Sequence, residues 1–178
     1  MPTDEPSHWL ILERYRVLGE LGRGAMGIVY QVHDERLDRV IALKTIRKDR
    51  STGAGESEES ALDRFRREAK AAGKLSHPGI VTIHDISEQD DELYITMEFV
   101  EGESLGARMR ATPRMPVAEA ARIVTRVCEA LQYAHANGVI HRDVKPDNIM
   151  CCPNGDVKLT DFGVARIVSS PATHIGRP

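Results

Sequence analysis

The sequence has no long hydrophobic run, few cysteines and little net charge. No apolar stretch approaches the roughly 20 residues that a membrane-spanning helix needs. Residues 1–8 are polar and show no basic segment followed by an apolar core. The 3 cysteines form neither a disulfide framework nor a metal-binding spacing. We therefore expect no export signal, no membrane segment in this chain, reduced thiols and a cytoplasmic location.

The net charge of -3 gives no general attraction to nucleic acid or anionic lipid, so neither is an expected partner. Hydrophobic residues make up 41% and charged residues 29% of the chain, which is typical of a folded globular protein rather than a disordered one. The 178 residues fit one domain or two small lobes. Composition alone therefore assigns no function.

The first hundred residues have the pattern of an antiparallel sheet with one helix. Short apolar runs between turn residues predict strands over residues 15–21, 28–32, 40–46, 80–84 and 93–100. Residues 51–60, rich in Gly, Ser and Glu, are interpreted as a linker. A helix is predicted after it, because apolar residues recur there at three- and four-residue spacing. These residues are Leu62, Phe65, Ala69, Ala72 and Leu75.

The pattern becomes helical after a polar bridge at residues 101–103. The strongest periodicity in the chain predicts a buried helix that ends at Asn137-Gly138. Its inward stripe is expected to consist of Val117, Ala120, Val124, Val127, Leu131 and Ala134. Two short strands are predicted near residues 148–151 and 157–159, on either side of a polar turn.

A glycine-rich loop, Gly22-x-Gly24-x-x-Gly27, lies between the first two predicted strands. Such a loop lets backbone N–H groups approach phosphate oxygens without obstruction by side chains. A dinucleotide-binding fold would place a helix after these glycines, whereas a strand follows here, and no Gly-Lys-Ser/Thr of a Walker A loop is present. By itself the motif fits a nucleotide-binding loop and a plain hairpin equally well.

Lys44 lies inside an apolar strand, on the same face as Ala42 by alternation. One interpretation is a lysine that extends from an edge strand into water. The other is an ion pair with Glu68, the charge on or beside the apolar face of the predicted helix, since each would relieve the desolvation cost of the other. The two charges alone favour the ion pair only slightly.

Two later segments concentrate charge after short apolar runs. Residues 141–148 read His-Arg-Asp-Val-Lys-Pro-Asp-Asn, and Asp161-Phe162-Gly163 directly follows a predicted strand. Either segment could be a plain solvated turn, because acidic residues are common turn formers. Neither assigns a function by itself.

Five elements have now been described: the glycine-rich loop, the strand with Lys44, the helical Glu68, residues 141–148 and Asp161-Phe162-Gly163. In this order and spacing they together resemble the signature set of the eukaryotic-type Ser/Thr protein kinases. The amino-acid sequences of the glycine loop and of residues 77–81 are most similar to those of the bacterial branch of that family. The resemblance covers residues 15–175. It implies an α+β, protein-kinase-like fold: an N-terminal tail (1–14), a five-stranded antiparallel small lobe with one helix (15–100), and the first part of a mainly helical large lobe (101–178).

The resemblance implies an ATP-binding site. Gly22, Gly24 and Gly27 would cover the ATP phosphates, and Lys44, paired with Glu68, would hold the α- and β-phosphates. The other nucleotide-binding residues would be Leu21, Val29, Ala42, the gatekeeper Met97, the hinge residues Glu98 and Val100, and Met150 beneath the adenine.

The resemblance also implies phosphoryl transfer to a protein substrate. Asp143 would accept the proton of a Ser or Thr hydroxyl, and Lys145 would neutralise charge on the transferred phosphoryl group. Asn148 and Asp161 would bind two Mg²⁺ ions. Lys145 is the feature typical of Ser/Thr rather than tyrosine kinases.

The family pattern also assigns a regulatory role to Arg142. It would pair with a phosphate on the activation segment, as in kinases that are switched by phosphorylation. Candidate residues for self-phosphorylation are Ser169, Ser170 and Thr173.

The end of the sequence departs from the family pattern. The residues stop at Pro178, inside the expected activation segment, and residues 176–178 read Gly-Arg-Pro where the family usually has Gly-Thr-Pro. Two hypotheses follow: a Ser/Thr protein kinase, or a truncated, catalytically impaired fragment that binds nucleotide or a partner kinase. A small-molecule phosphotransferase of kinase-like fold is disfavoured by Lys145. Without the later helices, the apolar face of the helix over 117–134 is expected to be partly uncovered.

Overall fold

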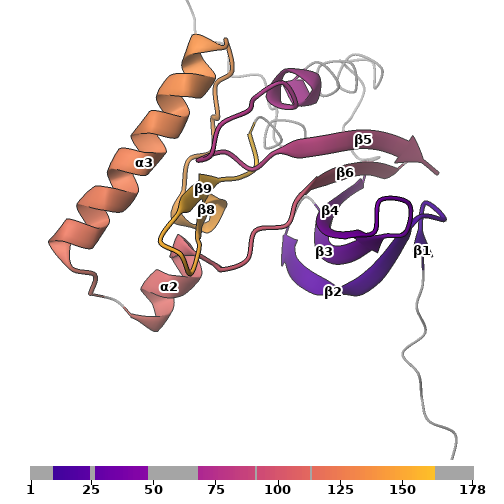
Figure 1. The fold of residues 1–178 in the computed structure, drawn as a ribbon, viewed down its shortest axis with the longest axis horizontal. Helices are drawn as coiled ribbons and strands as arrows, with labels where there is room; N and C mark the ends of the chain where they lie inside the picture. Colours follow the sequence, from indigo (N-terminus) through magenta and orange to yellow (C-terminus); the bar gives the residue numbers. More distant parts are fainter. Residues whose placement is uncertain (1–9, 25–26, 48–67, 91, 113, 163–178) are drawn as a thin grey trace, which may run out of the picture. The chain divides into compact units, whose positions relative to one another are not determined.

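The computed structural model describes residues 10–24, 27–47, 68–90, 92–112 and 114–162. The chain divides into two compact units, residues 1–48 with 81–102 and residues 49–80 with 103–178. The first unit is a sheet, and the second combines helices with a small sheet (Figure 1). The domain boundaries expected after residues 14 and 100 stay a prediction.

The first unit is built on one antiparallel sheet. Its strands are β1 (Leu10–Ile11), β2 (Tyr15–Gly24), β3 (Gly27–Asp34), β4 (Arg39–Arg47), β5 (Ile83–Gln89) and β6 (Glu92–Glu98). Their spatial order is β1-β2-β3-β4-β6-β5, and every neighbouring pair is antiparallel. Short connections make β1 to β4 a meander, as the spacing of turn residues predicts. The antiparallel sheet expected from the sequence is confirmed.

The sheet has six described strands rather than the five expected, because Leu10–Ile11 pairs with β2. A two-residue strand is too short to show alternation, so the sequence pattern places it in the tail. The strand expected at 80–84 lies at 83–89, and the one expected at 93–100 ends at Glu98. The strand was expected to end earlier because the acidic residues near Gln89 have the pattern of a turn. They can belong to a strand here because β5 is an edge strand, where charged side chains reach water. The reversal comes at Asp90, with φ 51°.

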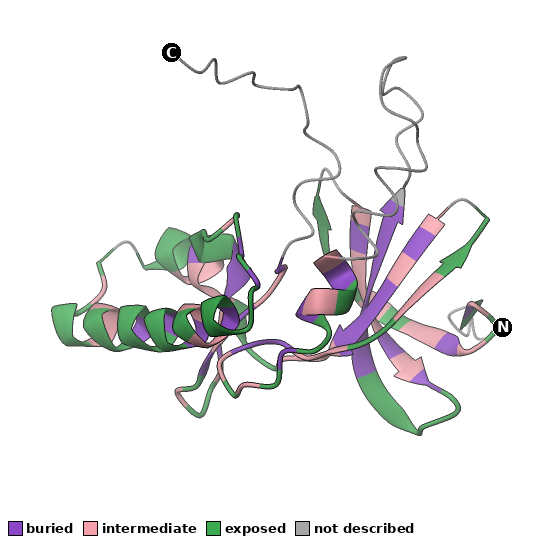
Figure 2. Ribbon diagram, turned by 90° about the horizontal axis from the view of Figure 1, so that it is seen from above, coloured by how far each residue is buried: buried purple, intermediate pink, exposed green. Residues whose placement is uncertain are grey.

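Side chains that alternate along the strands form the core of this sheet (Figure 2). The cluster consists of Ile11, Tyr15, Val32, Ile41 and Leu43, all buried. Burying one such side chain contributes about 1.5–3 kcal/mol relative to leaving it in water. The short strand β1 therefore belongs to the core through Ile11.

A buried carboxylate, Asp34, fastens the turn after β3 to the start of β2. Its side chain is only 1% exposed, and Arg14 donates to it through Nε at 2.8 Å and through Nη2 at 2.6 Å. The backbone N–H groups of Arg36 and Leu37 also donate to Oδ1, at 3.0 and 3.3 Å. The hydrogen bond from Arg14 is the main cause that lowers the pKa of Asp34.

The second unit combines short strands with helices. Its named elements are β7 (Glu103–Ser104), α2 (Leu105–Ala111), α3 (Val117–Ala136), the 3-10 helix η1 (Pro146–Asn148), β8 (Ile149–Cys151) and β9 (Val157–Leu159). The strands form a separate sheet in the order β7-β8-β9. Residues 68–72 are helical, and residues 62–67 of the expected helix lie outside the described ranges.

The inward face of α3 differs from the expected stripe. The buried residues are Ile123, Val127, Ala130 and Ala134, whereas Val117 is 86% and Val124 60% exposed. Apolar residues at three- and four-residue spacing occupy two adjacent faces of this helix, so periodicity could not decide which one is inward. The exposed apolar positions agree with the expectation of a partly uncovered face.

The end of α3 agrees with its signals. The helix ends at Ala136, Asn137 follows as its cap, and Gly138 has φ 74°. Within the described ranges, no helix is both long enough and apolar enough to cross a membrane.

Replacing Asp34 with Asn should lower the free energy of unfolding by about 2–3 kcal/mol near pH 7, because the partly buried guanidinium of Arg14 and two N–H groups lose a charged acceptor. Since the folded pKa of Asp34 is lowered, its stabilisation is complete above the unfolded pKa of about 4 and is lost as pH falls through the folded value. Thermal unfolding of both proteins from pH 7 to pH 3 measures the difference, which should shrink below about pH 4.

Asp38→Asn is the matched control, because Asp38 is an exposed aspartate in the same turn and should matter little. A difference between the native chain and Asp34→Asn that stays constant down to pH 3 would show that the ion pair is not its source.

Candidate active site

The glycine-rich segment forms the end of the β2–β3 hairpin, where Gly24 lies opposite Gly27. Gly27 has φ 138°, and a Cβ atom built on it would overlap the carbonyl oxygen of Thr45 on β4. A Cβ atom on Gly22 or Gly24 would meet no atom within 4 Å. The sheet itself therefore requires glycine at position 27, whereas it leaves room for a side chain at positions 22 and 24.

Four side chains expected near the nucleotide lie on one face of the sheet. Val29 on β3 is paired with Lys44 on β4, and Ala42 on β4 is paired with Met97 on β6. Paired residues, and residues two apart on one strand, share a face. Lys44, Ala42 and Met97 are buried. The strand register thus brings these four positions together, and the alternation predicts this for Lys44 and Ala42.

The expected hinge begins at the end of β6. The backbone N–H of Glu98 donates to the carbonyl oxygen of Thr82 at 2.9 Å, and its side chain accepts the N–H of Thr82 at 3.3 Å. These two hydrogen bonds fix the position of Glu98. They also occupy its backbone N–H group with a partner in the same unit. Val100 follows the strand and is half-buried, and Leu21 is exposed on β2.

In the second unit, two side chains of one loop converge on the carboxylate of Asp143. Lys145 Nζ donates to Oδ2 at 2.7 Å, and Asn148 Nδ2 donates to the same oxygen at 3.0 Å. Asn148 also donates to the backbone carbonyl of Asp143 at 2.9 Å. The turn of η1 makes this convergence possible, because it brings the buried Asn148 back toward Asp143.

Electrostatics keep this pair charged. The hydrogen bond from Lys145 is the main cause that lowers the pKa of Asp143, with a smaller contribution from Asn148. The same bond raises the pKa of Lys145. At neutral pH the loop therefore presents an ionised carboxylate beside an ammonium group.

The ring of His141 joins this loop to the next functional segment. Its Nδ1 accepts the N–H of Asp143 at 3.3 Å, so its Nε2 carries the proton and donates to the carbonyl of Thr160 at 2.8 Å. The ring also packs against Phe162 with centroids 4.5 Å apart. Burial lowers the pKa of His141, which keeps the imidazole neutral. The sequence motif contains His141, but its spacing assigns that residue no role.

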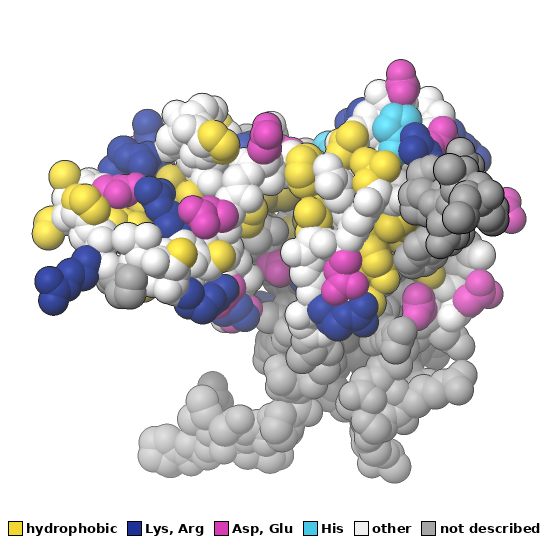
Figure 3. Space-filling model, turned by 90° about the horizontal axis from the view of Figure 1, so that it is seen from below, with side chains coloured by type: hydrophobic (Ala, Val, Ile, Leu, Met, Phe, Trp, Pro, Cys, Tyr) yellow, Lys and Arg dark blue, Asp and Glu magenta, His cyan; other side chains and the backbone are white. Residues whose placement is uncertain are grey.

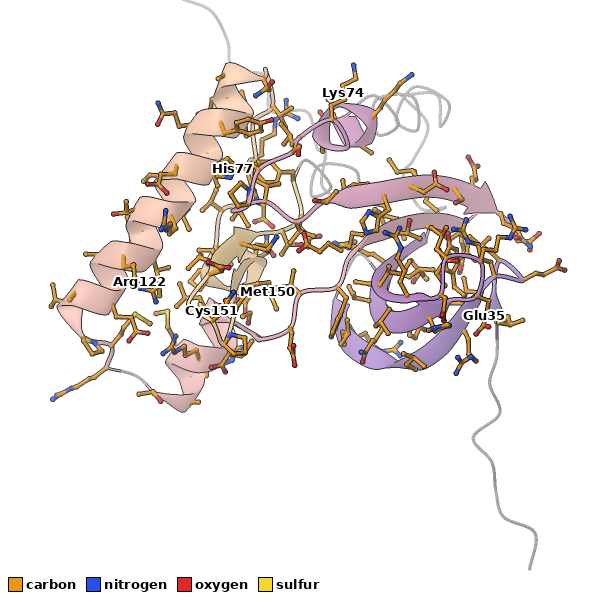
Figure 4. All side chains as sticks on the ribbon, in the orientation of Figure 1. Glu35, Lys74, His77, Arg122, Met150 and Cys151 are labelled. Atoms are coloured by element: carbon orange, nitrogen blue, oxygen red, sulfur yellow. The ribbon has the colours of Figure 1, made fainter. Side chains whose placement is uncertain are left out.

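Asp161 lies two residues beyond the end of β9, between Thr160 and Phe162, which both contact His141. The N–H of Leu159 in that strand donates to the carbonyl of Gly79 at 2.8 Å. The neighbouring His77, which is labelled in Figure 4, packs against Tyr133 of α3, with ring centroids 5.0 Å apart. Asp161 itself has φ 64°, in the left-handed region. Its position is thus tied through β9 to the long helix.

Glu68 forms an ion pair with Arg142, the residue before Asp143. Arg142 also has a left-handed backbone, with φ 66°. From the sequence, Glu68 is expected to pair with Lys44, and Arg142 with a phosphate. No pattern in the sequence indicates that the two residues pair with each other, and both expected pairings stay predictions.

For several of the expected site residues, the structure gives at most a position and does not test the role. Met150 is half-buried on β8, next to the buried Cys151 (Figure 4). Gly163, Ser169, Ser170, Thr173 and residues 176–178 lie outside the described ranges. Basic and acidic side chains are interspersed on the face that Figure 3 shows.

Comparison with known proteins agrees with this geometry. The family described as protein kinase domain matches residues 15–176. The chain is 42% identical over 161 residues to a probable serine/threonine-protein kinase, PknB, of Lactococcus lactis, covering 90% of this chain and 25% of the relative. It is 41% identical over 157 residues to the serine/threonine-protein kinase PrkC of Bacillus subtilis, covering 88% of this chain and 24% of the relative. The chain thus spans about a quarter of the length of these two relatives.

A solved structure shows the same fold. The crystal structure of the Mycobacterium tuberculosis PknI kinase domain matches with a TM-score of 0.73 and 38% identity, covering 89% of this chain and 62% of that chain. The chain therefore belongs to the protein kinase domain family, and the relatives described above are bacterial serine/threonine-protein kinases.

Proposed function

We propose that this chain carries the nucleotide-binding and phosphoryl-transfer residues of a Ser/Thr protein kinase, which moves the γ-phosphoryl group of ATP to Ser or Thr hydroxyls of proteins. The observation that carries the proposal is the carboxylate of Asp143, held in place by Lys145 and Asn148. Phosphoryl transfer depends mainly on positioning and on charge neutralisation, and these three side chains supply both.

Asp143 would orient the attacking hydroxyl and receive its proton. Its Oδ2 accepts hydrogen bonds from Lys145 and Asn148, and Oδ1 would then accept the proton of the hydroxyl. The hydroxyl oxygen bonds to the γ-phosphorus as the bond to the bridging oxygen breaks, and ADP leaves with that bond's electron pair. The ammonium of Lys145 would offset charge on the transferred group.

The donor set suits Mg²⁺, which accompanies ATP in this chemistry. The amide nitrogen of Asn148 is committed to Asp143, and this orients its amide oxygen as the group for a cation. Asp161 would supply a carboxylate. Such hard oxygen ligands are those that Mg²⁺ prefers, in small numbers and together with phosphate oxygens.

The first unit would bind the nucleotide. Backbone N–H groups near Gly22 and Gly24 would approach the phosphates, and Lys44 would neutralise them while paired with Glu68. The apolar residues that share a face with Lys44, namely Val29, Ala42 and Met97, would contact the adenine.

The three glycines should separate into two classes. Gly22→Ala and Gly24→Ala should leave the melting temperature within about 2 °C, because their Cβ atoms meet nothing, yet should weaken binding of Mg-ADP by crowding the phosphates. Gly27→Ala should lower the melting temperature without any ligand, because its Cβ overlaps Thr45. Thermal unfolding with and without Mg-ADP measures both effects. Equal destabilisation of the ligand-free protein by all three changes would contradict this division.

Asp143→Asn should reduce transfer of labelled phosphate from Mg-ATP, to the chain itself or to a basic test protein, by about 10²–10⁴-fold. It should retain thermal stabilisation by Mg-ADP. Asp161→Asn should lose that stabilisation, because a ligand of the metal is gone.

Asp156→Asn is the matched control, since the exposed side chain of Asp156 accepts a hydrogen bond from Asn154 within a local turn. Equal transfer by the native chain and Asp143→Asn would rule out catalysis by this loop. Stabilisation by Mg-ADP without any transfer would instead favour the alternative of a nucleotide-binding fragment.

A further inference from the structure

We propose that Thr45 is a positioning residue for the glycine-rich hairpin, because its hydroxyl group holds the base of that hairpin against β4. The inference rests on the proposed function, since it concerns the loop whose backbone N–H groups would approach the phosphates. It adds a residue to which the sequence motifs assign no role, and one that would act without touching the nucleotide.

Two hydrogen bonds join the side chain of Thr45 to the backbone of Ile28, near the start of β3. The hydroxyl oxygen accepts the N–H of Ile28 at 3.3 Å, and the hydroxyl group donates to the carbonyl oxygen of Ile28, also at 3.3 Å. The backbone of Thr45 lies close to the preceding residue as well, because its carbonyl oxygen occupies the space beside the Cα atom of Gly27. Thr45 therefore contacts two successive residues at the base of the hairpin.

Ile28 is the position through which this contact reaches the other glycines. It lies opposite Arg23 of β2, the residue between Gly22 and Gly24. The register of β2 with β3 shifts just before this point, between Glu20 and Gly22, and such an irregularity locally disrupts the ladder of backbone hydrogen bonds. The side chain of Thr45 thus supports the end of the hairpin next to an irregular part of its own ladder.

Thr45 lies on the face of the sheet opposite the expected nucleotide. It follows Lys44 on β4, so alternation places its side chain on the other face, the one that Leu43 shares with the buried cluster. Thr45 is itself buried, so water has little access to replace its hydroxyl group. Loss of the hydroxyl would remove the two bonds that tie Ile28 to β4, and the hairpin would then sample more positions.

A less restrained hairpin would bind phosphate more weakly although every group that contacts the ligand is still present. The apparent affinity falls with the fraction of chains in the binding-competent conformation. The net contribution of a hydrogen bond between uncharged groups corresponds to a change of about two- to tenfold in that fraction. The effect on binding therefore depends on the hydroxyl group and not on the methyl group of Thr45.

Two pairs of proteins differ in the hydroxyl group. Thr45→Val keeps the shape of the native side chain without the hydroxyl, and it should bind Mg-ADP about two- to tenfold more weakly than the native chain. Thr45→Ser keeps the hydroxyl and should restore nearly native affinity, although the loss of a buried methyl group lowers its stability. Thr45→Ala lacks both groups and should bind about two- to tenfold more weakly than Thr45→Ser. Titration calorimetry on the full chain measures the affinities, and thermal unfolding without nucleotide measures the stabilities.

Thr96→Val is the matched control. Thr96 is a buried threonine of the same sheet, and its hydroxyl donates to the carbonyl oxygen of Asp85 on the edge strand β5 at 3.4 Å. This variant should keep the native affinity for Mg-ADP even if its melting temperature falls, because the lost hydrogen bond lies away from the hairpin.

Affinities that follow the melting temperatures across these proteins, or equal affinities of Thr45→Ser and Thr45→Ala, would show that Thr45 only stabilises the sheet. Should Thr45→Val fail to fold, the serine and alanine variants still compare proteins with and without the hydroxyl. Absence of Mg-ADP binding by the native chain would instead contradict the proposed function, and the role of Thr45 in binding would be excluded with it.

Discussion

The neutral imidazole of His141 is the contact on which the candidate catalytic residues depend. One ring nitrogen accepts the N–H of Asp143 and the other donates to the carbonyl of Thr160. A single side chain therefore fixes the backbone at Asp143 and next to Asp161. A protonated ring would have no acceptor nitrogen for the first bond. Burial lowers the pKa of His141, and this keeps the ring in the form that makes both bonds. The phenyl ring of Phe162 covers it and adds apolar contact.

Much of the fold could be predicted from local patterns. The strands around the glycine loop and Lys44, and the end of the long helix at Asn137-Gly138, depend on alternation and on turn residues that lie close together in the sequence. The errors arose where a distant partner decides. Leu10–Ile11 becomes a strand only because β2 accepts it, and the inward face of α3 is chosen by what packs against it.

The candidate site divides in the same way. Alternation placed Ala42 and Lys44 on one face, and the register confirms it. The side-chain network around Asp143 depends on a turn that brings Asn148 back toward it. The spacing of the motif indicates a turn but does not show which side chains donate hydrogen bonds and which accept them. The pairing of Glu68 with Arg142 joins residues far apart in the chain, and both had other expected partners. Charge alone cannot choose among several acceptable partners.

Gly27 has a consequence for how sequences of this kind diverge. The carbonyl of Thr45 occupies the space that any side chain at position 27 would need, so selection for a stable sheet preserves this glycine without reference to a ligand. Nothing in the described part of the fold excludes a Cβ at positions 22 and 24. A gene copy that no longer needs to bind phosphate would accumulate substitutions at those two positions first. Retention of Gly27 in such a copy would indicate only that the protein still folds.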